Sequence, residues 1–225
     1  MNSVFEYLSD LSLNNDREWY HANKARHQQA NAEFEHIIGE LIMAIGKFDS
    51  SVIHNMPKDL TFKMARDTRF SHDKSPYNPK FRAHISSAGK LPIPVGYYIA
   101  IAPRGQSFLG GGLFAAMFKD ATTMIRDKIT KDGNEFEAIL SEKTFAGNFS
   151  VKGERLKKAP QGYNAGHPQA EYLINRSWYL EYFLADELVM DTSGFIDYAA
   201  QLFQCMKPFN DFLNAALEGF IMPAR

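Results

Sequence analysis

Apolar side chains recur with a helical period in segments near both ends of the chain. The spacing predicts a short helix over Val4–Leu11 and a long amphipathic helix from Arg17 to about Gly46, opened by the N-cap cluster Asn14-Asn15-Asp16. Helical spacing returns in the second half of the chain, over Ala115–Ile129, Asn134–Ser141, Pro168–Asn175 and Thr192–Leu217, the last interrupted at Pro208. Helices are therefore expected to flank a central block of different character.

In that block, apolar and polar residues alternate with a period of two. The alternation predicts strands at Thr61–Ala65, Lys80–Ile85, Tyr97–Ala102, Phe108–Phe114 and Trp178–Leu184. Short turns separate several of them, including the segment His72–Pro79 with its two prolines, and strands joined in this way form antiparallel sheets. The triplet Gly110-Gly111-Gly112 lacks the spacing of a nucleotide loop, so it indicates a kink or the close approach of another backbone.

The fold class expected from these patterns is α+β, with a mainly antiparallel sheet of about five strands flanked by N-terminal and C-terminal helices. No repeat or linker-like change of composition divides the 225 residues, so we expect a single domain over residues 1–225. The single cysteine, Cys205, lies in an apolar helical pattern and is interpreted as a core residue.

Composition narrows the functional classes. With 45% hydrophobic residues, 23% charged residues and a net charge of −1, the chain is typical of a soluble globular protein and unlike a disordered or generally basic one. No apolar run approaches the roughly 18 residues of a membrane span, and polar residues are mixed into the N-terminal segment. We therefore expect a cytoplasmic protein with no membrane partner.

Positive charge is concentrated in one segment of this slightly acidic chain. Residues 60–90 hold seven Lys or Arg and two Asp, a balance of +5, whereas the rest of the chain carries 18 basic and 24 acidic side chains. Such a concentration is typical of an anion site. Two interpretations stay open: an internal ion network within Arg66–Lys74, or a pocket in which the aspartates orient arginines that bind a ligand.

The same segment carries a family resemblance. Arg66-Asp67-x-Arg69-Phe70-Ser71-x-Asp73-Lys74-x-Pro76-Tyr77 resembles the signature of the bacterial and fungal family called domain of unknown function 2461. Further blocks follow in the family's order: Asn14-Asn15-x-Arg17-Glu18-Trp19, Gly96-Tyr97-Tyr98, Gly110-Gly111-Gly112, Ile125-Arg126, Gly153-Glu154-x-Leu156-Lys157, Pro160-x-Gly162-Tyr163 and His167-Pro168. The resemblance implies one domain of about this length and no settled activity. His72 and Asn78 stand where the family commonly has lysine.

The preferred hypothesis is a pocket for a phosphate- or carboxylate-bearing ligand, built from the hairpin Arg66–Arg82 and closed by the loop Lys152–His167. The candidate ligand-binding residues are Arg66, Arg69, Ser71, Lys74, Tyr77, Arg82 and Lys157. If the protein is an enzyme, which the sequence leaves open, the candidate catalytic residues are Asp67, Asp73 and His167, with His84 as a further acid–base candidate. The scattered histidines indicate no metal site, and no cofactor is implied.

Two alternatives remain. A nucleic-acid-associated module would use Lys63, Lys80, Arg82 and Lys90 along a backbone and aromatic rings such as Phe70, Tyr77, Tyr97 or Tyr98 on bases. A structural ion network would leave the function to a surface for a protein partner, which the sequence does not mark. The oligomeric state does not follow from either.

Overall fold

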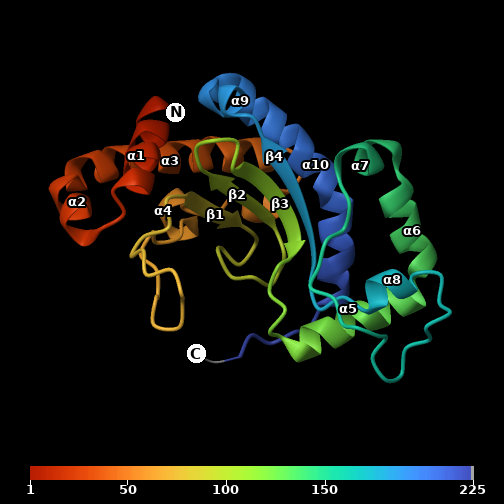
Figure 1. Cartoon of the computed structure of the whole chain (residues 1–225). Helices are drawn as coiled ribbons and strands as arrows, with labels where there is room; N and C mark the ends of the chain where they lie inside the picture. Colours follow the sequence, from red (N-terminus) through yellow and green to blue (C-terminus); the bar gives the residue numbers. More distant parts are fainter. Residues whose placement is uncertain (224–225) are drawn as a thin grey trace.

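The computed structural model describes residues 1–223, and within them four strands form one antiparallel sheet in the order β1-β2-β3-β4 (Figure 1). The strands are β1 (Phe81–Ile85), β2 (Tyr97–Ile101), β3 (Ser107–Leu113) and β4 (Trp178–Leu184). Each strand pairs with the next one in the sequence, as expected for strands joined by hairpins and one longer connection. The α+β class is confirmed, with four strands in place of about five.

Helices lie at both ends of the sheet and across one of its faces. They are α1 (Asn2–Leu13), α2 (Arg17–Ala22), α3 (Lys24–Ile45), α4 (Pro57–Leu60), α5 (Lys119–Lys131), α6 (Gly133–Ser141), α7 (Lys143–Asn148), α8 (Ala170–Leu173), α9 (Asp186–Met190) and α10 (Thr192–Ala216). Figure 1 shows α1 and α2 at one end of the molecule and α5 to α8 at the other. No helix in residues 1–223 is long and apolar enough to cross a membrane.

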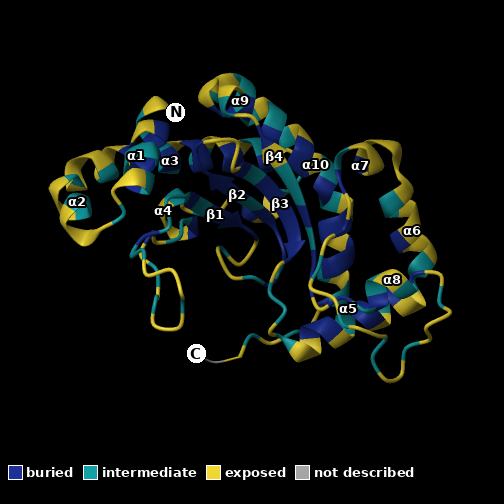
Figure 2. Ribbon diagram, in the orientation of Figure 1, coloured by how far each residue is buried: buried dark blue, intermediate teal, exposed yellow. Residues whose placement is uncertain are grey.

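The long helices α3 and α10 bury one face of the sheet. Alternate strand residues such as Ala83, Ile99 and Leu109, which are paired across β1, β2 and β3, point to this face and are fully buried (Figure 2). Apolar residues at helical spacing on α3, among them Phe34 and Leu41, complete the core from the helix side. Within residues 1–223, no long helix covers the opposite face of the sheet (Figure 1).

Two side-chain amides on α10, the buried Asn210 and the half-buried Asn214, fix the helix to the sheet. The Asn210 side chain accepts a hydrogen bond from the Gly112 N–H (2.8 Å) and donates one to the Gly96 carbonyl (3.1 Å). One turn later, Asn214 makes the corresponding pair of bonds with the N–H and carbonyl of Val95. Each amide therefore satisfies backbone groups that the sheet ladder leaves open.

Gly112 shows why the glycine triplet is needed in β3. Its φ is +85°, and a Cβ atom there would lie 2.3 Å from the carbonyl oxygen of Trp178. This is the close approach of another backbone that the sequence predicts, on the strand next to β3.

The predicted strand Thr61–Ala65 is wrong. The segment touches β1 through a bridge at Thr61 and Ala83, and a second bridge joins Ala65 to Tyr77. Between these two bridges, Asn78-Pro79-Lys80 forms a tight turn in which the Lys80 N–H donates to the Asn78 carbonyl (2.7 Å), and Pro79 has no N–H to give to a ladder. The pairing therefore breaks before a strand forms.

The helix predictions need three corrections. The long N-terminal helix is divided at Asn23 into α2 and α3, although Asp16 caps α2 as expected, by accepting from the Trp19 N–H (2.8 Å). Pro208 lies inside a continuous α10, because the buried side chains on either side of it keep the helix packed on the core. The third correction is α7, a helix that the sequence patterns did not predict; Glu142 caps it by accepting from the Phe145 N–H (2.8 Å).

Candidate functional site

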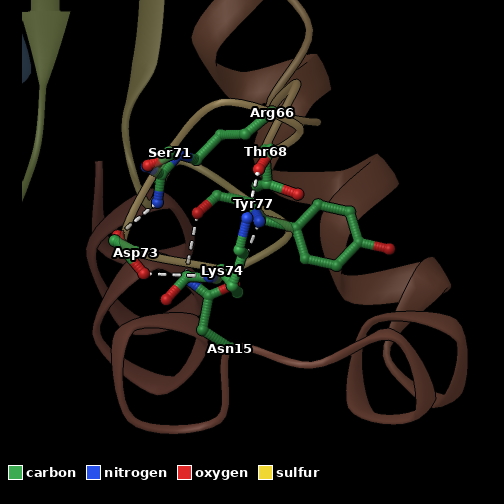
Figure 3. Close-up of polar contacts among 8 residues, drawn as sticks. Asn15, Arg66, Thr68, Ser71, Asp73, Lys74 and Tyr77 are labelled. Carbon is green, nitrogen blue, oxygen red and sulfur yellow. Dashed lines mark hydrogen bonds and ion pairs between the residues drawn. The ribbon is translucent and has the colours of Figure 1, made fainter.

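The signature loop, defined here as Arg66–Tyr77, contains its own counter-charges. Arg66 pairs with Asp73, and the Arg69 guanidinium lies 2.6 Å from an Asp67 carboxylate oxygen (Figure 3 for Arg66 and Asp73). Lys74 Nζ donates to the Thr68 carbonyl at 3.0 Å. Hydrogen bonds from Ser75 and from Arg66 hold the pKa of Asp73 below its usual range. The arrangement favours the ion-network interpretation for these residues.

Two other candidates serve to close the same loop. The Tyr77 ring is buried and stacks on Tyr20 with 4.1 Å between ring centroids. The Asn15 side chain binds both the N–H and the carbonyl of Tyr77, at 3.1 and 2.9 Å (Figure 3). Ser71 lies 3.4 Å from the Arg66 guanidinium. Tyr77 therefore anchors the signature loop to the N-terminal helices through its ring and its backbone.

The loop Lys152–His167 lies at the other end of the molecule from the signature loop (Figure 1). Lys152 pairs with Tyr179 of β4. The Tyr163 hydroxyl donates to Asp127 of α5 (2.7 Å), and His167 Nε2 lies 3.3 Å from the Thr130 carbonyl of α5. Lys157 and His167 are thus not brought together with Arg66, Arg69 and Lys74. The pocket predicted between the two segments does not form.

What the fold brings together instead is a set of side chains on the uncovered face of the sheet. The strand registers place His84, Tyr98, Gly110 and Glu181 in one row across the four strands. The adjacent row is Arg82, Ala100, Phe108 and Phe183. Because side chains alternate between the faces of a strand, both rows point away from α3 and α10.

A cleft of about 680 Å³ lies over this face, within the range of small-molecule sites. We call it the open-face cleft. Its walls include Phe62, His84, Lys90, Tyr98, Phe108, Phe114, Phe118, Glu181 and Met222.

Aromatic rings form a connected layer in this cleft. The Tyr98 ring is 5.6 Å from Phe108 and 5.5 Å from Phe114, between ring centroids. Phe114 in turn stacks on Tyr179 of β4 at 4.6 Å. Gly110 makes room for this ring, since a Cβ atom there would lie 2.9 Å from the Phe114 ring. The layer offers flat apolar surfaces on which a planar ring can stack.

His84 is the buried polar group of the cleft. Its side chain lies on the cleft side of β1 and is only 6% exposed. Burial lowers the pKa of His84 to about 4, although hydrogen bonds with the backbone of Leu91 and Lys90 act in the opposite direction. At neutral pH the cleft therefore holds a neutral imidazole that can donate and accept hydrogen bonds.

Two cations lie near Phe62 at the β1 edge of the cleft. Lys90 is one of the lining residues, and Arg82 adjoins the cleft through its contacts with Phe62 and Tyr98. Arg82 donates to the Lys63 carbonyl (3.1 Å), with its guanidinium carbon 5.6 Å from the Phe62 ring centroid. Lys90 Nζ donates to the Thr61 carbonyl (3.2 Å). Among residues 1–223, neither Arg82 nor Lys90 forms an ion pair with a carboxylate. Unlike the signature-loop arginines, they keep their charge available.

Glu181 marks the other edge of the cleft, on β4. Its carboxylate pairs with Lys152 Nζ at 3.0 Å, and that ammonium lies 5.8 Å from the Phe183 ring centroid. The pair leaves the charge of the cleft to Arg82 and Lys90. Among the described residues, no group of three His, Cys, Asp or Glu side chains comes together in a way that could hold a metal ion.

The sequence identified part of this site and missed the rest. Alternation placed Arg82 and His84 on one strand face, and the nucleic-acid alternative named Lys90 and Tyr98. No sequence pattern pointed to Phe62 or Phe114. One sequence signal could have found the aromatic part of the cleft: aromatic residues such as Tyr98 and Phe108 stand at positions of neighbouring strands that face the same side of the sheet. Of the rings considered for stacking on bases, Tyr77 and Tyr97 are buried in the core and Phe70 is 95% exposed.

Comparison with known proteins identifies the family. No curated protein and no solved structure matches the chain. A family model described as a conserved hypothetical protein, DUF2461, matches residues 3–212. The match spans the signature loop, all four strands and most of α10, so it covers both the ion network and the sheet that carries the cleft. The chain belongs to the DUF2461 family.

Proposed function

We propose that the protein binds a small organic anion, carrying a phosphate or a carboxylate on a planar ring, in the open-face cleft. The observation that carries this proposal is the pair Arg82 and Lys90, which form no ion pair with a carboxylate within residues 1–223 and bind the carbonyls of the residues after and before Phe62. Charged donors of this kind bind carboxylates and phosphates with hydrogen bonds stronger than neutral ones. The ligand class predicted from the sequence is kept, and its place moves from the signature loop to the cleft.

The aromatic layer and His84 add the other two features of a ligand site. Tyr98, Phe108 and Phe114 supply apolar surface, and a small number of polar groups at the edges fix the orientation of a ligand. A neutral His84 can bind a ligand group without adding charge to the cleft. A cytoplasmic location remains a prediction from the sequence.

The test uses 8-anilinonaphthalene-1-sulfonate, a fluorescent aromatic anion, and the uncharged analogue N-phenyl-1-naphthylamine. The native protein is expected to bind the anion more tightly than the analogue. Lys90→Gln is expected to weaken binding of the anion by about tenfold, because a hydrogen bond to a charged group contributes about 1.5–3 kcal/mol. Lys63→Gln is the matched control, since it removes the same charge from an exposed side chain that does not line the cleft.

Equal effects of the two substitutions would show that only the general charge of the protein matters. No binding of either probe to the folded protein would refute the proposal. Displacement of the bound fluorophore by a panel of aromatic carboxylates and phosphates would then rank candidate ligands.

A further inference from the structure

We infer that the ligand of the open-face cleft is an aromatic phosphate monoester, whose phosphate lies at the β1 edge against Arg82 and Lys90 and whose ring stacks on the Tyr98 layer. The inference rests on the proposed function and narrows it to one ligand class. Carboxylates, the other group that the proposed function allows, would fill the same edge less completely.

The hydrogen-bond donors that remain open on Arg82 and Lys90 favour a phosphate over a carboxylate. A guanidinium carries five N–H groups, and the partners of Arg82 among the described residues are the Lys63 carbonyl and the Tyr98 hydroxyl. Lys90 spends one of its three donors on the Thr61 carbonyl. Several donors therefore remain on two cations. A phosphate monoester presents three acceptor oxygens, whereas a carboxylate presents two.

The positive charge at the β1 edge of the cleft also favours a phosphate. Arg82 and Lys90 together place two positive charges at the β1 edge. The nearest carboxylate of the cleft, Glu181, lies three strands away across the row His84–Tyr98–Gly110–Glu181, about 14 Å at the usual strand spacing, and is already paired with Lys152. A phosphate monoester carries about −1.5 to −2 charges at pH 7 and matches this edge. A carboxylate leaves about one positive charge unmatched.

The aromatic rings of the cleft lie close to the two cations, which favours a ligand whose phosphate is attached directly to a ring. The Phe62 ring lies 5.6 Å from the Arg82 guanidinium carbon and 6.3 Å from the Tyr98 ring, measured from its centroid. Lys90 binds the carbonyl of Thr61, the residue before Phe62. Tyr98 continues to Phe108 and Phe114 on neighbouring segments. A ring attached directly to the phosphate would therefore reach an aromatic surface without a long linker.

The experiment compares three probes that share one ring: 1-naphthyl phosphate, 1-naphthoate and uncharged 1-naphthol, by calorimetry at pH 5.2 and 7.4. The phosphate is expected to bind about tenfold more tightly than the carboxylate at pH 7.4. Its affinity is expected to rise by up to about sevenfold between the two pH values, because its second proton leaves near pH 6. The carboxylate is ionised at both values, and its affinity is expected to stay constant.

The protein groups at the β1 edge are not expected to produce the rise in phosphate affinity between pH 5.2 and 7.4. The pKa of His84 is lowered to about 4 by burial, so the imidazole is neutral at both pH values. Burial raises the pKa of Tyr98. Arg82 and Lys90 are cations, and Glu181 is paired with the Lys152 ammonium.

Two variants locate the phosphate. Lys90→Gln and Arg82→Gln are each expected to abolish the preference for phosphate over carboxylate, while Lys63→Gln keeps it. Lys90→Gln alone carries the test if Arg82→Gln folds poorly, because Lys90 is exposed.

The outcomes distinguish failure of the phosphate inference from failure of the proposed anion binding. Equal affinities for 1-naphthyl phosphate and 1-naphthoate, with no rise from pH 5.2 to 7.4, would overturn this inference and leave the proposed function intact. No binding of either anion would overturn both. Tightest binding of 1-naphthol would show that the cleft selects for apolar surface alone and would also overturn both.

Discussion

Protonation of His84 links the stability of the fold to pH. The side chain is buried on the cleft side of β1, where burial lowers its pKa to about 4, against an ordinary value of 6.5. The unfolded chain therefore binds a proton at a higher pH than the folded chain does. The contribution of His84 to the free energy of unfolding is complete above pH 6.5, is lost as the pH falls from 6.5 to 4, and changes no further below 4.

The size of this effect follows from the shift. A lowering of about 2.5 pKa units corresponds to about 3 kcal/mol, since each unit is worth about 1.4 kcal/mol. This is a large part of the 5–15 kcal/mol that typically separates a folded domain from its unfolded state. Acidification to pH 4 is therefore expected to weaken the wild-type protein markedly through this one residue.

The assay is urea denaturation at pH values from 4 to 8, for the wild-type protein and His84→Gln. The difference in free energy of unfolding between the two proteins is expected to fall by about 3 kcal/mol between pH 7 and pH 4. Taking the difference removes other titrating groups, including His27, whose pKa is also lowered by burial. The exposed His36→Gln serves as the control and is expected to follow the wild-type curve. Parallel curves for wild type and His84→Gln would refute the reasoning.

Three further predictions concern the framework of the cleft. Asn210→Ala leaves a buried N–H and a buried carbonyl without partners and is expected to cost about 2–4 kcal/mol in urea denaturation; a loss below 1 kcal/mol would contradict this. Gly112→Ala is expected to lower the melting temperature strongly, whereas Gly147→Ala, in α7 with open space around it, is expected to raise it slightly. Asn15→Ala is expected to speed trypsin cleavage in the signature loop, because Tyr77 loses both backbone bonds; an unchanged cleavage rate would contradict this.

The alternation of apolar and polar residues predicted a strand correctly where one face of the strand is buried in the core and the other is more exposed along its whole length. The predicted strand Trp178–Leu184 coincides with β4, because its residues alternate between the core face and the open face over its full length. The same pattern failed at Thr61–Ala65. Alternation shows that a segment is extended, but it does not show whether a neighbouring strand continues beside it, and here the turn at Pro79 ends the pairing.

The cleft was hard to predict for a different reason. Its residues come from β1, β2, β3, β4 and the segments beside them, and they share a face only in the observed strand register. Charge density in the sequence marked residues 60–90 correctly as unusual. It did not show which cations meet carboxylates. Arg66 and Arg69 find theirs within a closed loop, whereas Arg82 and Lys90 bind backbone carbonyls.

The signature loop and the cleft are joined by the segment between them. The Arg66 N–H donates to the Pro76 carbonyl and the Asn78 N–H to the Met64 carbonyl, both at the base of the loop (2.9 and 2.8 Å). The pairing with β1 is made by the bridge between Thr61 and Ala83 and by the Phe62 N–H, which donates to the Arg82 carbonyl (2.9 Å). Carbonyls of the same segment accept from Lys90 and Arg82. The signature loop therefore closes on the segment that carries the carbonyl partners of the two cations, a connection that neither sequence interpretation contained. The strongest family signature thus marks the support of the proposed binding edge, and the edge itself lies on its neighbours in the chain.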